Sequence, residues 1–548
     1  MPVLQTLRQA VGSRLKAFRF WRPEVWFAGV ACAVAGVIML TQLPAPYWFD
    51  EANTVYYVQQ PWARMLAFVA NDWFPPGYYF LLKAWTVAFG VGEIATGVLS
   101  LLTTIVAALL VYFFGRQLFD ATVAFRATVL FWIAQSTIFF ATETRMYALL
   151  VAAGVILTWL LSQIFRYPRS WSWYGWYVVA GIVGTYIHYP FWFFVFAHNV
   201  VWLLWRRQHR VEGSIIPWVA GQVAIVAAYV PQFVVLYDRV LHWYLAPSQR
   251  WLDNIPINFY IFWRMPFELL VWYVADVPVW ISSAVITLVI TALGLVFFQF
   301  RFSRRTLAIG LRVTDLRAAA LAIIVLVPLT ILWSLRAPVS RYVSYTLPFF
   351  CLLIFRGISH LTRHWAQQWF FVALIAAVMS ANVFVVLTTK LHYQDAYWPV
   401  VHSVMRTIPP QPGTAIVAHY EDSVLLSYYY GGGLPMVRLP IPKESVEGID
   451  LPLAYARRVG LHWINQESLH DLGAQLRGFD TVWYVRAGGA VHYDPDRLLD
   501  NALRQYCRVG EVFVIPHHPD WRYGTIELQR YHTCVFQPLD HIDVGLKR

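Results

Sequence analysis

Eleven long apolar runs constrain the fold of this 548-residue chain more than any other feature. A helix needs about 20 mainly apolar residues to cross the roughly 30 Å hydrocarbon core of a bilayer. Charged residues make up only 13% of the chain, about half their usual share in soluble domains. We therefore expect a polytopic α-helical membrane protein of about 11 transmembrane helices, near residues 24–43, 92–114, 121–140, 147–165, 172–189, 190–205, 215–235, 278–300, 317–335, 342–356 and 367–388.

The basic residues indicate how these helices are oriented. Up to Thr389 the chain holds 27 Lys and Arg against 13 Asp and Glu, whereas the remainder holds 15 against 17. Basic clusters precede the first run and then follow alternate connections, and Lys and Arg near span ends are retained in the cytoplasm. The amino terminus is then cytoplasmic and the chain after Thr389 lies outside. Because the excess positive charge belongs to the membrane part, a nucleic-acid partner is not expected.

Two domains follow from the pattern, a transmembrane domain over 1–389 and an extracytoplasmic α/β domain over 390–548. The first external loop, 44–91, contains a short apolar stretch that opens with Pro75-Pro76 and carries Lys83. This stretch is too short to span a bilayer, and we interpret it as an interfacial helix on the outer face.

Past Thr389 the apolar pattern changes to short alternating segments. It predicts strands at Thr414–Ala418, Met436–Leu439, Thr481–Val485, Val512–Ile515 and Thr525–Leu528, with helices near 420–429, 465–477 and 496–506. Cys507 and Cys534 each lie next to a predicted strand in this external domain. An oxidising compartment favours a disulfide between them, and the alternative is a pair of buried free thiols.

Two adjacent carboxylates, Asp50 and Glu51, lie a few residues beyond the first span in an aromatic setting. Burial among aromatic rings raises the pKa of a carboxyl group, while a nearby cation keeps one acid ionised, so the pair suits a general base with a metal ligand or hydrogen-bond acceptor beside it. The alternative is a solvated helix cap.

Further charged residues reach the same external face in the predicted topology. Glu143 and Arg145 lie at the end of the third span, and Arg341 precedes the tenth. Arginine binds phosphate in a planar, bidentate manner, and an external arginine suits an anionic lipid phosphate. The alternatives are an ion pair that closes a helix end and a headgroup anchor. His188, between the fifth and sixth spans, is either a ligand-binding or a structural histidine.

These pieces in this order resemble the C-type glycosyltransferase superfamily, and in particular bacterial relatives of the dolichyl-phosphate-mannose protein mannosyltransferases, glycosyltransferase family 39. The resemblance covers most of residues 24–430. It is carried by Asp50-Glu51, Pro75-Pro76-Gly77-Tyr78-Tyr79, Gly115-Arg116-Gln117-Leu118-Phe119, Glu143-x-Arg145-Met146-Tyr147, His188-Tyr189 and Arg341-Tyr342 with Pro348. The family often has Gln-Glu-Ala where this chain has Thr142-Glu143-Thr144.

The resemblance implies the C-type glycosyltransferase fold and the transfer of a sugar, mannose or another hexose or pentose, from a polyprenyl-phosphate carrier, with inversion. It implies that Asp50 is the catalytic base and that Glu51 positions the acceptor or holds a divalent cation, Mg²⁺ or Mn²⁺. The implied donor-phosphate ligands are Arg145, Arg341, Tyr342 and Lys83. The implied substrate-binding residues are Glu143, His188, Tyr189 and Tyr147.

The implied partners are the lipid-linked donor, the membrane and an acceptor that is a lipid, a glycan or a protein, and the implied location is a bacterial inner membrane. Two other classes of function remain open. A multispan polysaccharide polymerase or ligase would place its essential residues on a large late loop. A transporter or sensor would use a polar path through the membrane or the external domain, and Asp50 would be dispensable.

Overall fold

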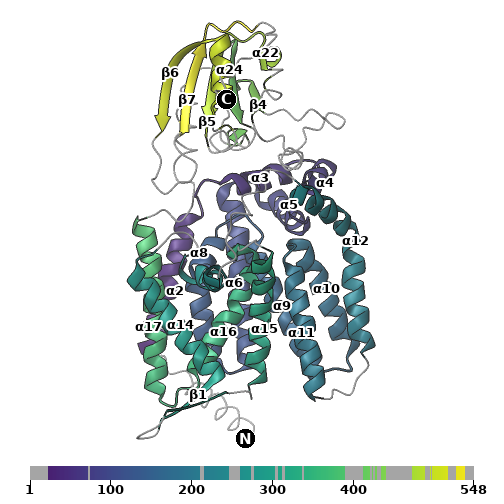
Figure 1. The fold of residues 1–548 in the computed structure, drawn as a ribbon, viewed down its shortest axis with the longest axis vertical. Helices are drawn as coiled ribbons and strands as arrows, with labels where there is room; N and C mark the ends of the chain where they lie inside the picture. Colours follow the sequence, from purple (N-terminus) through teal and green to yellow (C-terminus); the bar gives the residue numbers. More distant parts are fainter. Residues whose placement is uncertain are drawn as a thin grey trace, which may run out of the picture.

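The architecture is a bundle of helices topped by a small α/β domain (Figure 1). A computed structural model describes residues 23–71, 74–209, 215–245, 259–272, 277–302, 307–311, 315–335, 339–388 and 411–419, and in the C-terminal region residues 422–423, 426, 428, 433–439, 464, 469, 472–487, 494, 496–515 and 526–536. Two C-terminal predictions lie mainly outside them, the helix near 420–429 and the amino-terminal half of the one near 465–477.

Every apolar run of the sequence forms helix, because backbone groups at membrane depth must hydrogen-bond within the chain. The helices that correspond to the runs are α2 (Pro23–Gln42), α6 (Glu93–Leu118), α7 (Ala121–Ile133) with α8 (Gln135–Phe140), α9 (Tyr147–Arg166), α10 (Trp171–Ile187), α11 (Phe191–His209), α12 (Ile216–Leu245), α14 (Val279–Phe297), α15 (Leu316–Ser334), α16 (Leu347–Ile358) and α17 (His364–Thr388). Seven helices of the described chain are long and apolar enough to cross a membrane. The total of about 11 spans stays a prediction.

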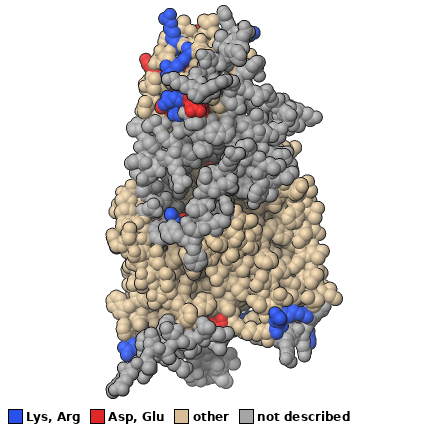
Figure 2. Space-filling view, viewed as in Figure 1, with Lys and Arg blue, Asp and Glu red and all other residues tan. Residues whose placement is uncertain are grey.

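The surface agrees with a membrane setting. On the face drawn in Figure 2, charged side chains gather towards the two ends of the molecule and leave a broad uncharged band over the helical part. The band includes large exposed apolar side chains of several helices, among them Val106, Leu109 and Phe113 of α6. Apolar surface of this extent is compatible with lipid rather than with water.

The first external segment folds into three short helices, α3 (Phe49–Gln59), α4 (Trp62–Asn71) and α5 (Gly77–Phe89). They lie across the end of the bundle, between it and the α/β domain (Figure 1). Helix α5 follows Pro75-Pro76 directly, as the interfacial-helix prediction requires. A side chain at Gly77 would collide with the backbone of Tyr186, because a Cβ there would lie 2.6 Å from its carbonyl oxygen. Glycine at this position therefore allows α5 to pack against the end of α10.

The structure contains two features that the apolar pattern did not predict. The predicted third span is broken at Ala134 into α7 and α8, and an irregular turn over 141–146 separates α8 from α9. Near the opposite end of the bundle, β1 (Phe298–Phe302) and β2 (Leu307–Leu311) pair as an antiparallel hairpin. The chain also forms α13 (Phe259–Phe267) and the π-helical turn Glu268–Trp272 before α14, and the 3₁₀ turn Ser340–Thr346 before α16.

The C-terminal sheet has the order β4-β3-β5-β7-β6. Its strands are β3 (Thr414–His419), β4 (Met436–Leu439), β5 (Thr481–Arg486), β6 (Arg508–Ile515) and β7 (Ile526–His532). Strand β3 is parallel to β4 and β5, whereas β7 is antiparallel to β5 and β6. All five predicted strands exist, and the described helices of this domain include α22 (Leu472–Gln475) and α24 (Leu498–Tyr506). The predicted domain boundary near Thr389 falls outside the described residues.

The two faces of the sheet have different partners. One face packs on α24 through a core that includes Val417, Val482, Leu499 and Leu503. The other face packs on the helical part, where Ile416, Ala418, Trp483 and Val485 share an apolar cluster with Tyr47, Ala52 and Val55. The external domain is therefore in contact with the start of α3.

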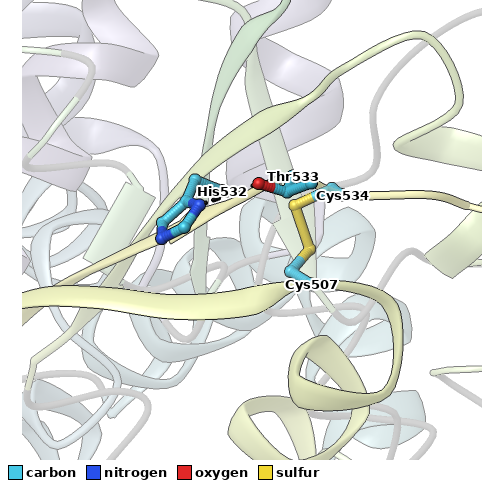
Figure 3. The surroundings of a disulfide bond; sticks show 4 residues. All are labelled: Cys507, His532, Thr533 and Cys534. Atoms are coloured by element: carbon cyan, nitrogen blue, oxygen red, sulfur yellow. Dashed lines mark hydrogen bonds between the residues drawn. A yellow bond between two sulfur atoms is a disulfide. The ribbon is translucent and has the colours of Figure 1, made fainter.

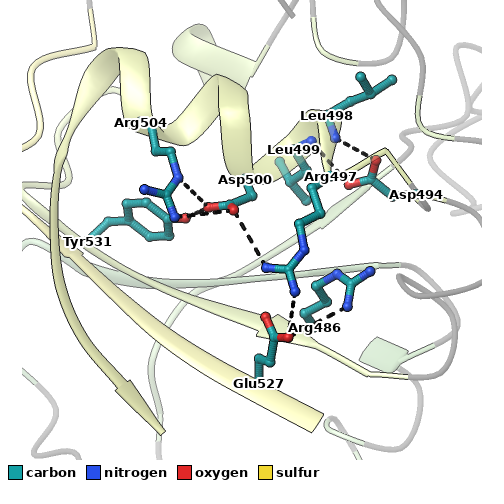
Figure 4. Close-up of polar contacts among 9 residues, drawn as sticks. All are labelled: Arg486, Asp494, Arg497, Leu498, Leu499, Asp500, Arg504, Glu527 and Tyr531. Carbon is teal, nitrogen blue, oxygen red and sulfur yellow. Dashed lines mark hydrogen bonds and ion pairs between the residues drawn. The ribbon is translucent and has the colours of Figure 1, made fainter. Parts of the chain in front are cut away.

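A disulfide and an ion-pair network hold the external domain together. Cys507 and Cys534 are bonded, with their Cα atoms 4.1 Å apart, which confirms the disulfide rather than the free thiols (Figure 3). In Figure 4, Asp500 of α24 accepts a hydrogen bond from Tyr531 of β7 and pairs with Arg504. Arg497 joins Asp500 to Glu527 of β7, so α24 is tied to the sheet by charge as well as by packing.

Candidate active site

Glu51 connects the start of α3 to the turn that precedes α9. Its Oε2 accepts a hydrogen bond from the Trp48 backbone N–H at 3.1 Å. A negative charge in this first turn also interacts favourably with the dipole of α3. Its Oε1 accepts from the backbone N–H of Thr144 at 2.6 Å. The side chain is buried, and burial raises the pKa of Glu51 to about 7. Both carboxylate oxygens of Glu51 are therefore engaged by backbone groups.

Arg145 reaches from that turn to α3 and holds Asp50 from the buried side. Its Nη1 donates to Thr54 Oγ1 at 2.6 Å and to the Asp50 carbonyl oxygen at 3.2 Å. Its Nη2 lies 3.9 Å from Asp50 Oδ2, and its guanidinium lies 4.5 Å from the centre of the Phe74 ring. Only 3% of the Arg145 side chain is exposed. This arginine fixes both the backbone and the carboxylate of Asp50.

Arg341 approaches the same carboxylate from the more open side. Its Nη1 lies 4.0 Å from Asp50 Oδ2, and 27% of the Arg341 side chain and 24% of the Asp50 side chain are exposed. The guanidinium lies within 6 Å of the ring centres of Trp48, Tyr147 and Tyr342. Asp50 is thus an accessible carboxylate between two guanidinium groups, one buried and one exposed.

Glu143 is the third acid of this cluster, and it is fully buried. Neither of its carboxylate oxygens has a hydrogen-bond partner among the described residues. Burial raises the pKa of Glu143 to about 8, and the nearby Glu51 adds to this effect while Arg341 and Arg145 oppose it. A buried carboxyl group without a partner is costly, and natural proteins retain such groups chiefly at functional sites.

The rings of His188, Tyr147 and Tyr342 lie together beside the two arginines. His188 lies 5.0 Å from Tyr342 and 6.1 Å from Tyr147, measured between ring centres. Burial, together with the nearby Arg145 and Arg341, lowers the pKa of His188 to about 3, so the imidazole is neutral. His188 Nδ1 and the Tyr147 hydroxyl are buried without hydrogen-bond partners in the described structure. They offer hydrogen-bonding atoms to a polar ligand.

Two predicted ligands lie in other surroundings. The Lys83 ammonium donates to the carbonyl oxygens of Val58 at 2.8 Å and Gln60 at 2.6 Å, at the carboxyl end of α3. These contacts account for its burial, so the structure gives Lys83 a helix-capping role in place of the predicted phosphate contact. Tyr189 accepts a hydrogen bond from Gln232 of α12 at 2.9 Å. The other predicted site residues converge near Asp50.

The predicted metal role of Glu51 stays a prediction. Both Glu51 oxygens accept one backbone hydrogen bond each, and each keeps a further lone pair. Within the described part of the chain, no group of three or more His, Cys, Asp and Glu side chains is placed to hold a metal ion.

Sequence reasoning missed several residues that build the site. Thr54 lies four residues after Asp50, on the same face of a helix, and this spacing was a usable signal. Phe74 lies against Arg145 and directly precedes Pro75-Pro76 in the chain. Trp48 lies against Arg341 and is two residues before Asp50. The contacts of Thr144 with Glu51 and with Thr96 join residues far apart in the chain, and no local pattern reveals them.

Comparison with known proteins gives a segment match and a fold match. Residues 74–234 match the family model of dolichyl-phosphate-mannose-protein mannosyltransferase. The structure is similar to ArnT from Cupriavidus metallidurans bound to undecaprenyl phosphate, with a TM-score of 0.51 and 13% identity, over 93% of this chain and 98% of that one. No curated protein matches by sequence.

Two further solved structures are similar at lower scores. The Archaeoglobus fulgidus oligosaccharyltransferase tethered to an acceptor peptide has a TM-score of 0.43 and 13% identity, over 95% of this chain and 76% of that one. The arabinofuranosyltransferase AftD from mycobacteria, as the R1389S mutant, has a TM-score of 0.45 and 14% identity, over 94% of this chain and 42% of that one.

The fold match extends over nearly the whole of both chains, and the segment match covers the region that supplies Glu143, Arg145 and His188 to the cluster. The helical bundle also carries the apolar surface and spans of a multi-pass membrane protein. The chain therefore has the fold of this solved structure, and residues 74–234 are similar to the mannosyltransferase family model.

Proposed function

We propose that this protein is a membrane glycosyltransferase that moves a sugar from a polyprenyl-phosphate carrier to an acceptor on the extracytoplasmic face, with inversion at the anomeric carbon. The observation that carries the proposal is the placement of Asp50 between Arg145 and Arg341, at 3.9 and 4.0 Å. One accessible base between two phosphate-binding groups suits the breaking of a sugar–phosphate bond. The structural neighbour solved with undecaprenyl phosphate supports this class of carrier.

The reaction is a single displacement. The Asp50 carboxylate takes the proton of an acceptor hydroxyl as the acceptor oxygen forms its bond to the anomeric carbon. The bond between that carbon and the phosphate oxygen breaks on the opposite side, and the polyprenyl phosphate leaves with its electron pair. Its negative charge grows in the transition state, where the guanidinium groups stabilise it. No nucleotide is needed, because the donor phosphate ester supplies the free energy.

The two arginines divide the work according to their exposure. Arg341 is the more accessible and receives the donor phosphate first. Arg145 is buried and already bonded to Thr54 and to the Asp50 backbone, so it orients the base and stabilises the leaving group from within. Glu143, His188 and Tyr147 supply hydrogen-bonding atoms for the hydroxyl groups of the sugar. Tyr342 lies against Arg341 and limits the orientation of its guanidinium.

We further propose that the external face is extracytoplasmic, in a bacterial inner membrane with the amino terminus in the cytoplasm. The distribution of positive charge in the sequence supports this orientation. The acceptor would reach Asp50 from the space around α3 and the external domain, and the donor would enter sideways from the bilayer.

The test is transfer of radiolabelled sugar in proteoliposomes from a panel of polyprenyl-phosphate mannose, glucose and arabinose. Asp50→Asn preserves shape and removes the base, so we expect at least about a 100-fold loss of kcat. Arg341→Ala should raise the donor KM at least about 10-fold, since a hydrogen bond to a charged group is lost. Unchanged transfer in Asp50→Asn would refute the base assignment, and failure of every donor with wild-type protein would refute the reaction class.

A further inference from the structure

Three buried hydroxyl groups form a continuous chain beside the site. Tyr47 Oη lies 2.6 Å from Thr96 Oγ1, and Thr96 Oγ1 lies 2.8 Å from Thr144 Oγ1. Tyr47 also donates to the carbonyl oxygen of Val91 at 2.9 Å. Thr96 Oγ1 also lies 3.3 Å from the carbonyl oxygens of Gly92 and Glu93, so the protons of the three hydroxyl groups can be arranged in more than one order. All three hydroxyl-bearing residues are buried. We call this set the Tyr47–Thr96–Thr144 relay.

The relay joins three segments that no secondary structure connects. Tyr47 precedes α3, Thr96 lies in the first turn of α6, and Thr144 belongs to the irregular turn before α9. Within the turn, the Arg145 N–H bonds the Glu143 carbonyl oxygen at 2.8 Å. The relay, the bond from the Thr144 N–H to Glu51 and the bond from Ser100 Oγ to the Glu143 carbonyl oxygen hold the turn against its neighbours.

The turn is the part of the chain that carries the site's charged groups. Thr144 stands between Glu143 and Arg145, so a shift of its backbone moves both neighbours. Arg145 is in turn the group that contacts the backbone and carboxylate of Asp50. A displacement of the Thr144 side chain would therefore also displace Arg145 and, through it, Asp50. The relay therefore reaches Asp50 through Arg145, and its effect on the base is indirect.

The other end of the relay is in contact with the external domain. The Tyr428 ring packs edge-on against the Tyr47 ring, with centres 5.1 Å apart. The Tyr428 hydroxyl donates to the Val91 carbonyl oxygen at 3.3 Å, which is the same acceptor that Tyr47 uses. The apolar cluster between the sheet and α3 surrounds this contact. The pair of Tyr47 and Tyr428 therefore links the external domain to the irregular turn over 141–146.

We propose that Tyr47, Thr96 and Thr144 are positioning residues of the sugar transfer, and that the external domain acts on the active site through the contact of Tyr428 with this relay. The inference rests on the proposed function. It assigns a task to the external domain, which is to hold Glu143, Arg145 and Asp50 in their relative positions. Fold similarity alone does not supply this task. An undocked external domain would leave Tyr47 and the turn without this support.

The test uses full-length protein in proteoliposomes with the best donor of the panel. Thr144→Val removes the hydroxyl and keeps the branched shape, and we expect kcat to fall about 10- to 100-fold with the donor KM within about 2-fold. Thr144→Ser restores the hydroxyl and should recover most of kcat. The matched control is Thr103→Val in α6, whose hydroxyl bonds the Leu99 carbonyl of its own helix at 2.7 Å. Tyr428→Ala should lower kcat about 2- to 10-fold, the value of one aromatic pair.

A second measurement separates this inference from the proposed function. Amide hydrogen exchange over residues 143–146 reports the order of the turn without any turnover. We expect exchange to rise about 10-fold in Thr144→Val and to stay at the wild-type rate in Thr103→Val. Equal exchange in Thr144→Val and wild type, or a full kcat in Thr144→Val, overturns the relay. Inactivity of wild type with every donor overturns the proposed function alone, and the exchange result then still decides on the relay.

Discussion

Glu143→Gln should stabilise the protein at high pH while impairing its activity. The wild-type carboxyl group is fully buried and its two oxygens lack partners in the described structure. Burial raises its pKa from an ordinary 4.5 to about 8. Between these two values the folded state holds a proton that the unfolded chain releases, so the stability contributed by this group falls as pH rises. Above pH 8 the folded protein contains an ionised buried carboxylate, and a glutamine at this position removes that cost.

The size of the effect follows from the difference between the two pKa values. One pKa unit corresponds to about 1.4 kcal/mol, which gives an upper bound near 5 kcal/mol. The arginines nearby and relaxation of the site reduce it, and we expect about 2 to 4 kcal/mol at pH 9 and close to zero at pH 5. In the same variant, sugar transfer should fall at least about 10-fold, because the carboxyl group is lost as a hydrogen-bond partner of the substrate.

Thermal unfolding in detergent over pH 5 to 9, at a fixed scan rate, measures the stability difference. The Tm of Glu143→Gln should exceed that of wild type by about 2 to 4 °C at pH 9 and match it at pH 5. The control is Gln163→Leu, at a buried polar position of α9. Because neither side chain titrates, its Tm difference from wild type should not depend on pH. A constant difference for Glu143→Gln across the range would refute the raised pKa, and a lower Tm at pH 9 would show that the carboxylate is paired.

The remaining predictions concern the disulfide and the reassigned lysine. Replacing Cys507 and Cys534 by serine should lower the stability of the external domain by about 3 kcal/mol, seen as a lower unfolding midpoint of that domain under non-reducing conditions; an unchanged midpoint would contradict a stabilising role. Lys83→Met should lower the Tm through the lost cap of α3, a cost of about 2 kcal/mol, and leave the donor KM within about 2-fold, whereas Arg341→Ala raises that KM without a comparable loss of stability. A large rise of the donor KM in Lys83→Met would restore the predicted phosphate contact.

Sequence reasoning succeeded for the helices because lipid imposes one solution on the backbone. Each apolar run forms helix, and most ends lie within a few residues of the prediction, although α12 continues to Leu245 where an end near 235 was predicted. The break at Ala134 escaped notice because apolar composition continues through it. The hairpin of β1 and β2 was missed although Phe298, Phe300 and Phe302 alternate with polar residues, a pattern typical of a strand. The predicted span 278–300 included Phe298 and Phe300, whereas the helix ends at Phe297.

The candidate site shows a different limit. Asp50, Arg145 and Arg341 were found because a carboxylate and two external arginines in a membrane protein are unusual. Their individual tasks depend on contacts between segments far apart in the chain, which composition and spacing do not reveal. Glu51 illustrates the difference, since its charge favoured a metal or acceptor role and its bonds to Trp48 and Thr144 give it a positioning role.

Exposure separates groups that are identical as residue types. Two arginines flank one carboxylate at nearly equal distances, yet 3% of one and 27% of the other is exposed. A buried guanidinium that already bonds Thr54 has little freedom to follow a ligand, whereas an exposed one held by aromatic rings can receive it. If this division is right, Arg145→Lys and Arg341→Lys differ in kind. Lysine keeps the charge and loses the planar fork, so the first should lower kcat through a displaced Asp50, and the second should raise the donor KM through a weaker phosphate contact. Equal effects of both substitutions on kcat and KM would show that the two arginines act as one phosphate clamp.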